Sequence, residues 1–275
     1  MPTIATVILV LRSIFGKTIW ERRRSMPWWI GGLAFLLIVT ILSYPSFKDT
    51  QGLEDLFKNM QPMLAMFGVE SAADLFSPVG LINARMYESI GILVIGAFAI
   101  SMGTAALAGE EDRGTMELLL MQPISRRSIV LQKHAALTVL LIGINVFLAI
   151  VLFVGNPVLD GLLSVQGILA ANVGATLVGF LFGSLALAIG GVTGKRGMTN
   201  GISAGYLAAA FFFNGIANIV DGLKWTQKLT PFYWFSRADP LANGFPMGDF
   251  VVLLVVGLVL VGVGLWGFDR RDVVV

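Results

Sequence analysis

The sequence contains no cysteine and a single histidine, His134. The absence of cysteine excludes disulfide bonds, thiolate metal sites and cysteine nucleophiles. A single imidazole also excludes a histidine metal cluster and argues against the usual arrangements in which a histidine acts as the general base. Acid–base chemistry would therefore depend on carboxylates, lysines or tyrosines, and we expect the chain to have no catalytic residues, metal site or cofactor of its own.

Charge is also scarce, because Asp, Glu, Lys and Arg make up 13% of the 275 residues, against about 25% in soluble domains. Six stretches contain no charged residue at all, and each is close to the roughly 20 residues that a helix needs to cross a bilayer. They do not alternate between apolar and polar residues as barrel strands do. We predict an all-α membrane protein with one transmembrane domain, residues 1–275, and six spans over 27–44, 89–109, 135–155, 165–193, 200–220 and 250–267.

The basic residues predict how these spans are oriented. Thirteen of the 19 Lys and Arg residues lie in the two terminal segments, 1–26 and 268–275, and in the loops 110–134 and 194–199. The positive-inside rule then places both termini of a multi-pass protein in the cytoplasm, at the cell (inner or cytoplasmic) membrane. The outer loops are 45–88, 156–164 and 221–249. A net charge of +2 gives no reason to expect a nucleic-acid partner, and we interpret the basic pairs Lys195-Arg196 and Arg270-Arg271 as topological anchors.

Two segments outside the spans have apolar residues at helical spacing. The segment 4–20 predicts an amphipathic helix in the inner interface, before the first span. The segment 53–67 predicts a second one on the outer surface, kinked at Pro62. Ser77 followed by Pro78 is typical of a helix start, and the aromatic residues of 221–249 are typical of the outer aromatic belt of a membrane protein.

Within the spans, the polar residues are uncharged. A proton relay or a tight ion site in a membrane would normally include an ionisable side chain, so the sequence argues against ion-coupled transport. The pairs Gly179/Gly183 and Gly201/Gly205 have the spacing that lets membrane helices approach closely. We interpret both pairs as packing positions.

The most informative segment is the charged loop between the second and third spans, residues 109–133. Gly114 and Pro123 bracket a short helix predicted over 116–122, with Thr115 as its cap and acidic residues near its positive end. Ser125 is positioned to cap the next helix. A short helix with an apolar run and flanking charges suits a partner's groove, and the alternative is a tight loop whose leucines dip into lipid.

This loop resembles that of ABC-2 type transporter permeases. The similarity is carried by Glu110, Gly114-Thr115, Glu117, Pro123, Ser125-Arg126 and Lys133, and the chain-wide layout of spans and loops is similar too. The resemblance implies a permease that pairs with a second copy, as a homodimer or a heterodimer, and binds separate ABC ATPase subunits that hold ATP and magnesium.

The resemblance also implies roles for individual residues. The coupling helix that contacts the ATPase corresponds to Glu110, Gly114, Thr115, Met116, Glu117, Leu118, Leu119, Leu120, Pro123, Ser125 and Arg126. The N-terminal segment 1–26 corresponds to a cytoplasmic connecting helix, which includes Leu11, Arg12, Phe15 and Lys17. An exported cargo would be hydrophobic or amphipathic, such as a drug, lipid, peptide or natural product, and sodium export is represented in the family as well.

The chain lacks a phosphate loop of its own. The segment Gly191–Arg196 approaches one but has the wrong spacing, and Arg196 stands where a Ser or Thr should bind magnesium. Two further function classes stay open from the residues: a lipid-modifying membrane enzyme using Arg85 with Glu88 or Arg237 with Asp239, and a passive channel.

Overall fold

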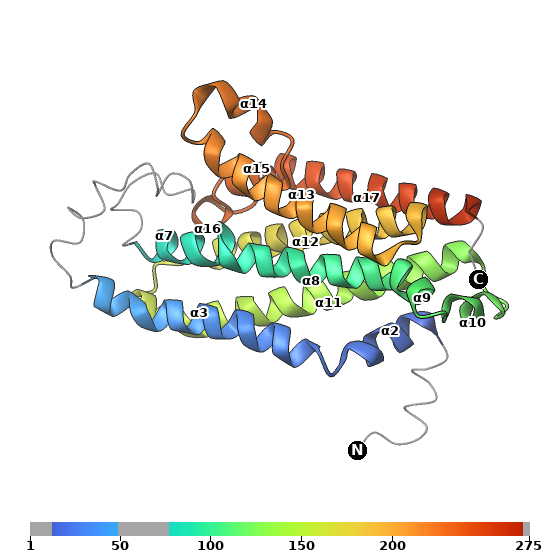
Figure 1. The fold of residues 1–275 in the computed structure, drawn as a ribbon. Coiled ribbons are helices and arrows are strands. Elements are labelled where there is room, and N and C mark those ends of the chain that lie inside the picture. The colour runs from blue at the N-terminus through green and yellow to red at the C-terminus, as the bar shows by residue number, and fades with distance from the viewer. Residues whose placement is uncertain (1–12, 49–76, 272–275) are drawn as a thin grey trace, which may run out of the picture.

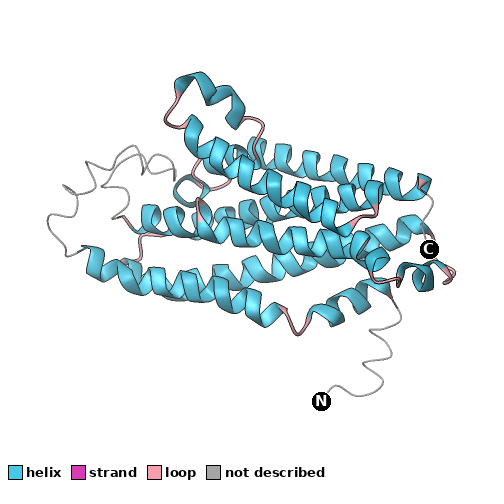
Figure 2. Ribbon diagram, viewed as in Figure 1, coloured by secondary structure: helices cyan, strands magenta, loops and turns pink. Residues whose placement is uncertain are grey.

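The long helices of the protein form a single bundle. The computed structural model describes residues 13–48 and 77–271, and all the regular elements in these ranges are helical, which confirms the all-α prediction (Figure 2). The six longest described helices are α3 (Met26–Lys48), α8 (Ile90–Ala106), α11 (Arg126–Gly155), α12 (Val165–Thr193), α13 (Arg196–Ala217) and α17 (Met247–Arg270). The predicted outer helix over 53–67 lies outside the described residues.

Shorter helices occupy the two ends of the bundle. One end carries α2 (Ile14–Arg22), α9 (Ala108–Asp112), α10 (Met116–Leu120) and the last turn of α17; we call it the charged end (Figure 1). The opposite end, here the aromatic end, carries α7 (Pro78–Ile82), the π-helix η1 (Asn83–Tyr87), the 3₁₀ helices η2 (Asn156–Leu159) and η3 (Asp221–Leu223), α14 (Lys224–Gln227), α15 (Pro231–Ser236) and α16 (Pro240–Asn243).

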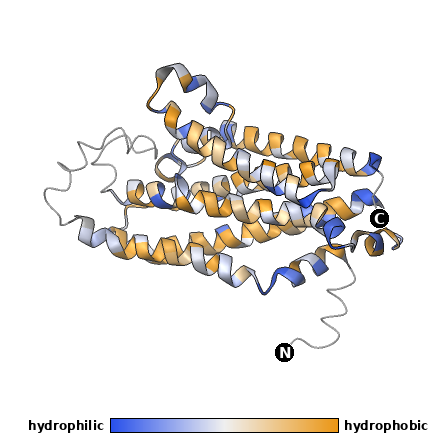
Figure 3. Cartoon of the chain, in the orientation of Figure 1, coloured by the Kyte–Doolittle hydropathy of each residue, from blue (hydrophilic) through white to orange (hydrophobic). Residues whose placement is uncertain are grey.

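Five helical stretches are long and apolar enough to cross a membrane: Met26–Ser46, Pro78–Ala106, Arg126–Leu159, Val165–Thr193 and Met247–Arg270. Hydrophobic residues run along these helices, whereas hydrophilic residues gather near their ends (Figure 3). The helix α13 has 22 residues, but Arg196, Asn200 and Asn214 make it less apolar than the others. A sixth span at this position therefore stays a prediction.

Helix α12 is the centre of the bundle and packs against α8, α11, α13 and α17. Glycines set the distances between α12 and two of these helices, α8 and α17. A Cβ added at Gly103 of α8 would lie 2.3 Å from the carbonyl oxygen of Gly183, and one at Gly191 would lie 2.5 Å from that of Gly264 in α17. Without these glycines the helices could not approach so closely.

The two glycine pairs of the sequence behave differently. Gly179 and Gly183 face side chains of α8 and α11, so their packing role is confirmed. Gly201 and Gly205 of α13 have no atom within 4 Å of an added Cβ, so they do not pack against another described helix of the chain. Their face of α13 is open.

The aromatic loop 221–249 is only partly a belt. Thr230 caps α15, and Phe232 and Phe235 of that helix are buried in the main hydrophobic core. Phe235 stacks edge-to-face on Tyr87 at 6.1 Å between ring centroids. The belt interpretation is therefore wrong for these two residues, whereas Trp225 is 64% exposed. Composition alone does not show which face of a short helix turns inward.

Candidate functional site

Three consecutive acids at the charged end each pair with a different long helix. They are Glu110, Glu111 and Asp112, the last turn of α9. The chain reaches them through a break at Leu107, with φ −123° and ψ −68°, which separates α9 from α8. The break redirects the short helix, and its three neighbouring carboxylates face three directions.

Glu110 is the buried member of the set. Its carboxylate accepts a hydrogen bond of 2.5 Å from Lys133 of α11, and both side chains are about nine-tenths or more buried. The Thr115 hydroxyl also donates to it, and Arg113 lies 3.5 Å away. Burial alone would raise the pKa of Glu110, but Lys133, Thr115 and Arg113 outweigh burial and hold that pKa below its usual range. The pair is therefore an ionised link between α9 and α11.

Glu111 forms a two-pronged pair with Arg271, just beyond α17. One Arg271 nitrogen donates to it at 2.9 Å, and the second bonds its other oxygen. Gly194, which ends α12 with φ +63°, makes room for the pair, because a Cβ there would lie 1.9 Å from the Arg271 guanidinium. Arg271 also donates to the carbonyl of Gly191 at 3.3 Å. Glu111 therefore joins α9 to the ends of α12 and α17.

Asp112 pairs with Arg196, the first residue of α13, at 3.1 Å. Both side chains are about half exposed, so water competes for this bond and weakens it. The side chains of Glu110 and Glu111 are 6% and 8% exposed, so burial is lost only at the third acid.

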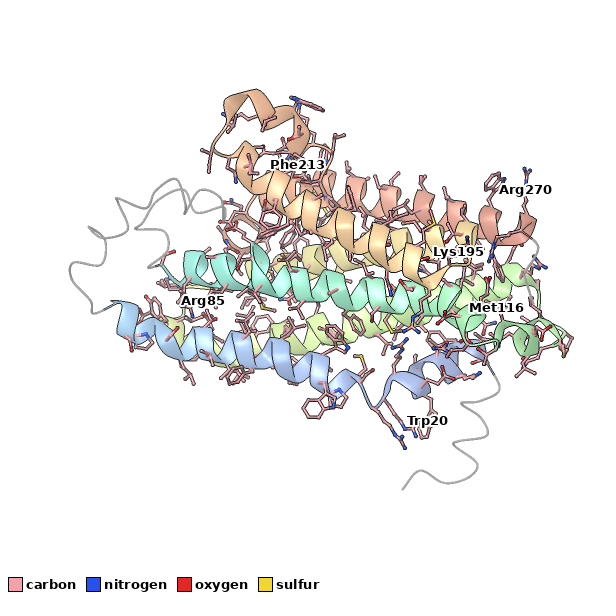
Figure 4. All side chains as sticks on the ribbon, in the orientation of Figure 1. Trp20, Arg85, Met116, Lys195, Phe213 and Arg270 are labelled. Atoms are coloured by element: carbon pink, nitrogen blue, oxygen red, sulfur yellow. The ribbon has the colours of Figure 1, made fainter. Side chains whose placement is uncertain are left out.

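The short helix α10 follows, after Gly114 turns the chain with φ +66°. Met116 and Leu119 are buried in a second hydrophobic cluster with Ile14 of α2, Ile129 of α11 and Phe268 of α17. Leu118 and Met121, by contrast, are 63% and 78% exposed. Figure 4 places Met116 at the charged end, together with Lys195 and Arg270. One face of α10 anchors it, and another presents apolar side chains outward.

The flanking residues set the limits of α10. It ends at Leu120, two residues before the predicted end, and Pro123 is exposed in the turn beyond. Thr115 makes no cap hydrogen bond, because its hydroxyl binds Glu110 instead, so the predicted capping role is wrong. Ser125 does cap α11, accepting from the Ser128 amide at 3.2 Å as predicted.

Arg126 fastens α11 to the end of α17. Its guanidinium donates to the carbonyl oxygens of Phe268 and Arg271, at 3.1 and 2.8 Å. A cation here satisfies the free carbonyls of the helix terminus. Next to it, Arg127 pairs with Asp269 at 2.6 Å.

The helix α2 lies along the start of α11. The Phe15 amide donates to Gln132 at 3.2 Å, and Lys17 is 3.6 Å from Glu21 on its own helix. Leu11 and Arg12 lie outside the described residues. The structure therefore brings α2, α9, α10 and the start of α11 together at one end.

The sequence profile described as ABC-2 family transporter protein matches residues 12–273. The chain belongs to the ABC-2 family. A search of curated proteins gave no match. As an ABC-2 transporter membrane protein it is a permease component of an ABC transporter, and such permeases work with ABC transporter partners such as ATPase subunits. Permeases of this family are the membrane transport component of the transporter and are not themselves catalytic.

The geometry of this ABC-2 permease explains its false phosphate loop. Gly191 to Thr193 form the last turn of α12, and Gly194 caps it by donating its amide to the Gly190 carbonyl at 2.9 Å. Phosphate loops use the positive N-terminal end of a helix. The segment here presents the opposite, negative end.

Sequence reasoning missed several members of the site. Arg196 and Arg271 were interpreted as anchors, but each pairs with an acid of α9. The available signal was three adjacent acids at the end of one predicted span and basic residues at the ends of two others. Such complementary charges indicate pairing, although not which partner each acid takes.

Proposed function

We propose that this permease is driven by ATP hydrolysis in separate ABC ATPase subunits, and that α10 is the coupling helix that docks into them. The observation that carries the proposal is the outward face of α10, where Leu118, and Met121 just after the helix, are exposed beside a buried anchor. Apolar side chains on a short, fixed helix fit a partner's groove. This face would lie in the cytoplasm, where the ATPase is found, together with both termini.

The acids of α9 supply the path from α10 into the membrane. A displacement of α10 pulls on α9, which is bonded to α11 through Glu110, to α17 through Glu111 and to α13 through Asp112. A two-state transporter needs contacts that differ between its states. Two buried links and one exposed link give it contacts of unequal strength.

The class of cargo is inferred from the composition of the spans. The predicted spans contain no charged residue, which favours export of a hydrophobic or amphipathic compound over that of an ion, including sodium. A second permease copy would complete the pathway, and the open face of α13, with Gly201 and Gly205, supports such a pairing. The sequence of the partner copy decides between a homodimer and a heterodimer.

An enzymatic role is less well supported. Arg237 bonds Asp249 at 2.6 Å, and Asp239 accepts hydrogen bonds from Asn83 and from the Ala242 amide of α16. Both side chains thus hold the aromatic end together. Activity of the purified chain on lipid substrates without a partner would reverse this assessment.

The experiment co-expresses the permease with the ABC ATPase encoded by a neighbouring gene. Leu118→Asp puts a charge on the outward face of α10, and we expect loss of ATPase co-purification and of stimulated ATP hydrolysis. Leu162→Asp is the matched control, because Leu162 is 61% exposed at the other end of the bundle. Equal retention of the ATPase by both variants, or transport by the chain without ATP, would contradict the proposal. Deletion of 116–122 and Glu117→Lys should also release the ATPase.

A further inference from the structure

A cavity of about 440 Å³ opens between α2, α8, α9 and α11 at the charged end. Five basic side chains line it against two acidic ones, Glu21 and Glu110, which leaves an excess of three positive charges. The basic side chains are Lys17, Arg22, Arg24, Arg113 and Lys133. An excess of this kind in a concave site attracts anions.

The acids of the cavity are already engaged. Glu110 is taken by Lys133, and Glu21 lies beside Lys17. Among residues 13–48 and 77–271, neither Arg22 nor Arg24 has an ion pair or a side-chain hydrogen bond. Arg22 is half-buried. Burial, followed by repulsion from Arg113, lowers its pKa and outweighs the attraction of Glu21 and Glu110. A partly buried guanidinium without an acceptor is costly, so an anion bound there would stabilise it.

The position of the cavity identifies the source of the anion. Ser25 lines the cavity, and α3 begins at the next residue. Trp28 is 83% exposed, and Phe35 and Leu42, spaced seven residues apart on the same face, are 70% and 63% exposed. An exposed tryptophan above an apolar helix face marks the headgroup level of a bilayer. The cavity therefore lies where lipid phosphates lie.

We propose that this cavity binds a phosphate group, supplied by an anionic phospholipid, with Arg22 and Arg24 as its principal ligands. Arginine matches phosphate oxygens with two parallel hydrogen bonds. Basic pockets at the ends of membrane helices hold lipid headgroups in the same way. Since α2 and Glu110 both line the cavity, a bound headgroup would join α2 to α9. The proposal depends on membrane insertion and not on the cargo or the ATPase.

The test measures lipid binding by the purified full-length chain in detergent. Phosphatidylglycerol should raise the unfolding temperature and remain bound in native mass spectra, whereas zwitterionic phosphatidylcholine should do neither. Arg22→Gln with Arg24→Gln should weaken phosphatidylglycerol binding on the order of tenfold, and Arg22→Lys with Arg24→Lys should restore part of it. Arg270→Gln is the matched control, because Arg270 lies at the same end but outside the cavity.

Each outcome of the test has a definite meaning. Equal binding by the wild type and the double Gln variant would overturn the proposal, as would an equal loss in the Arg270→Gln control, since either result indicates general surface attraction. Native mass spectra report binding directly, so a destabilised variant remains informative. If inorganic phosphate alone stabilises the wild type and displaces phosphatidylglycerol, the phosphate site is supported and its occupant is soluble phosphate.

Discussion

The two ends of the bundle are held together by different chemistry. At the charged end, bonds between full charges join α9 to three long helices, and the most buried of them is Glu110 with Lys133. At the aromatic end, Phe232 and Phe235 wedge α15 into the core, and neutral bonds such as Tyr206 to the Leu229 carbonyl at 2.8 Å close the loop. Arg237 with Asp249 adds an ion pair there as well.

This difference separates an end where ion pairs lie over a small hydrophobic cluster from an end held mainly by rings packed into the main core. Ion pairs at an interface can be exchanged between two arrangements without opening a cavity. Packed aromatic rings lose many contacts at once when they separate. If ATP drives this permease, the charged end is suited to transmit movement, and the aromatic end is suited to resist it.

The largest expected effect comes from breaking the buried pair of the charged end. Lys133→Met removes the buried cation of Glu110 and leaves only the half-exposed Arg113, 3.5 Å away. Breaking a buried pair in this way costs about 3–5 kcal/mol. We expect a much lower unfolding temperature and poor recovery of monodisperse protein, measured by thermal unfolding and size exclusion. The double variant Glu110→Gln with Lys133→Met should recover most of the loss, because no charge is left unpaired. A single variant as stable as the wild type would mean that Arg113 or water compensates the charge of Glu110.

The next effect tests the aromatic end. Phe235→Ala removes a ring that is 1% exposed and packs on Tyr87. A cost of about 3 kcal/mol is expected, near the lower end for a buried aromatic, because the surrounding short helices can relax. Phe213→Ala is the control, since Phe213 is 50% exposed, and it should be nearly neutral in the same unfolding assay. Similar losses in the two variants would remove the distinction between a packed wedge and a surface ring.

The long helices could be predicted from where charge is missing, because a bilayer excludes charge along a whole span. Helix starts at Ser77 and Ser125 could also be predicted, since a cap depends on residues three positions away. The sequence around Thr115 also predicts a helix cap, but its hydroxyl donates to the buried carboxylate of Glu110 instead. Local rules hold only where no stronger partner is near.

The pairs of the charged end could not be predicted individually. Asp112 and Arg196 are 84 residues apart, and Glu111 and Arg271 are 160 residues apart. Which acid faces which helix depends on the break at Leu107, and nothing in the local sequence marks that break. The same limit explains the wrong interpretation of Phe232 and Phe235.

Two glycines with similar positive φ, one at each end, allow a finer comparison of the ends. Gly194 and Gly161 have φ of +63° and +70°, but an added Cβ meets Arg271 and Glu111 only at Gly194. Gly161→Ala at the aromatic end should cost about 1 kcal/mol for the left-handed backbone. Gly194→Ala has the same backbone cost and displaces an ion pair as well, so we expect a stability loss of about 2 kcal/mol in thermal unfolding. Equal costs would show that the Glu111–Arg271 pair adds nothing.

The smallest effect is expected at the exposed member of the three acids. Arg196→Gln breaks the pair with Asp112, whose side chains are 52% and 50% exposed, and a loss of about 0.2–1 kcal/mol is expected. Salt screens exposed pairs much more than buried ones, so 1 M NaCl should remove the difference between this variant and the wild type. The deficit of Lys133→Met should persist at the same salt concentration. If 1 M NaCl changes the stability deficits of the two variants by the same amount, burial does not distinguish the Asp112 pair from the Glu110 pair.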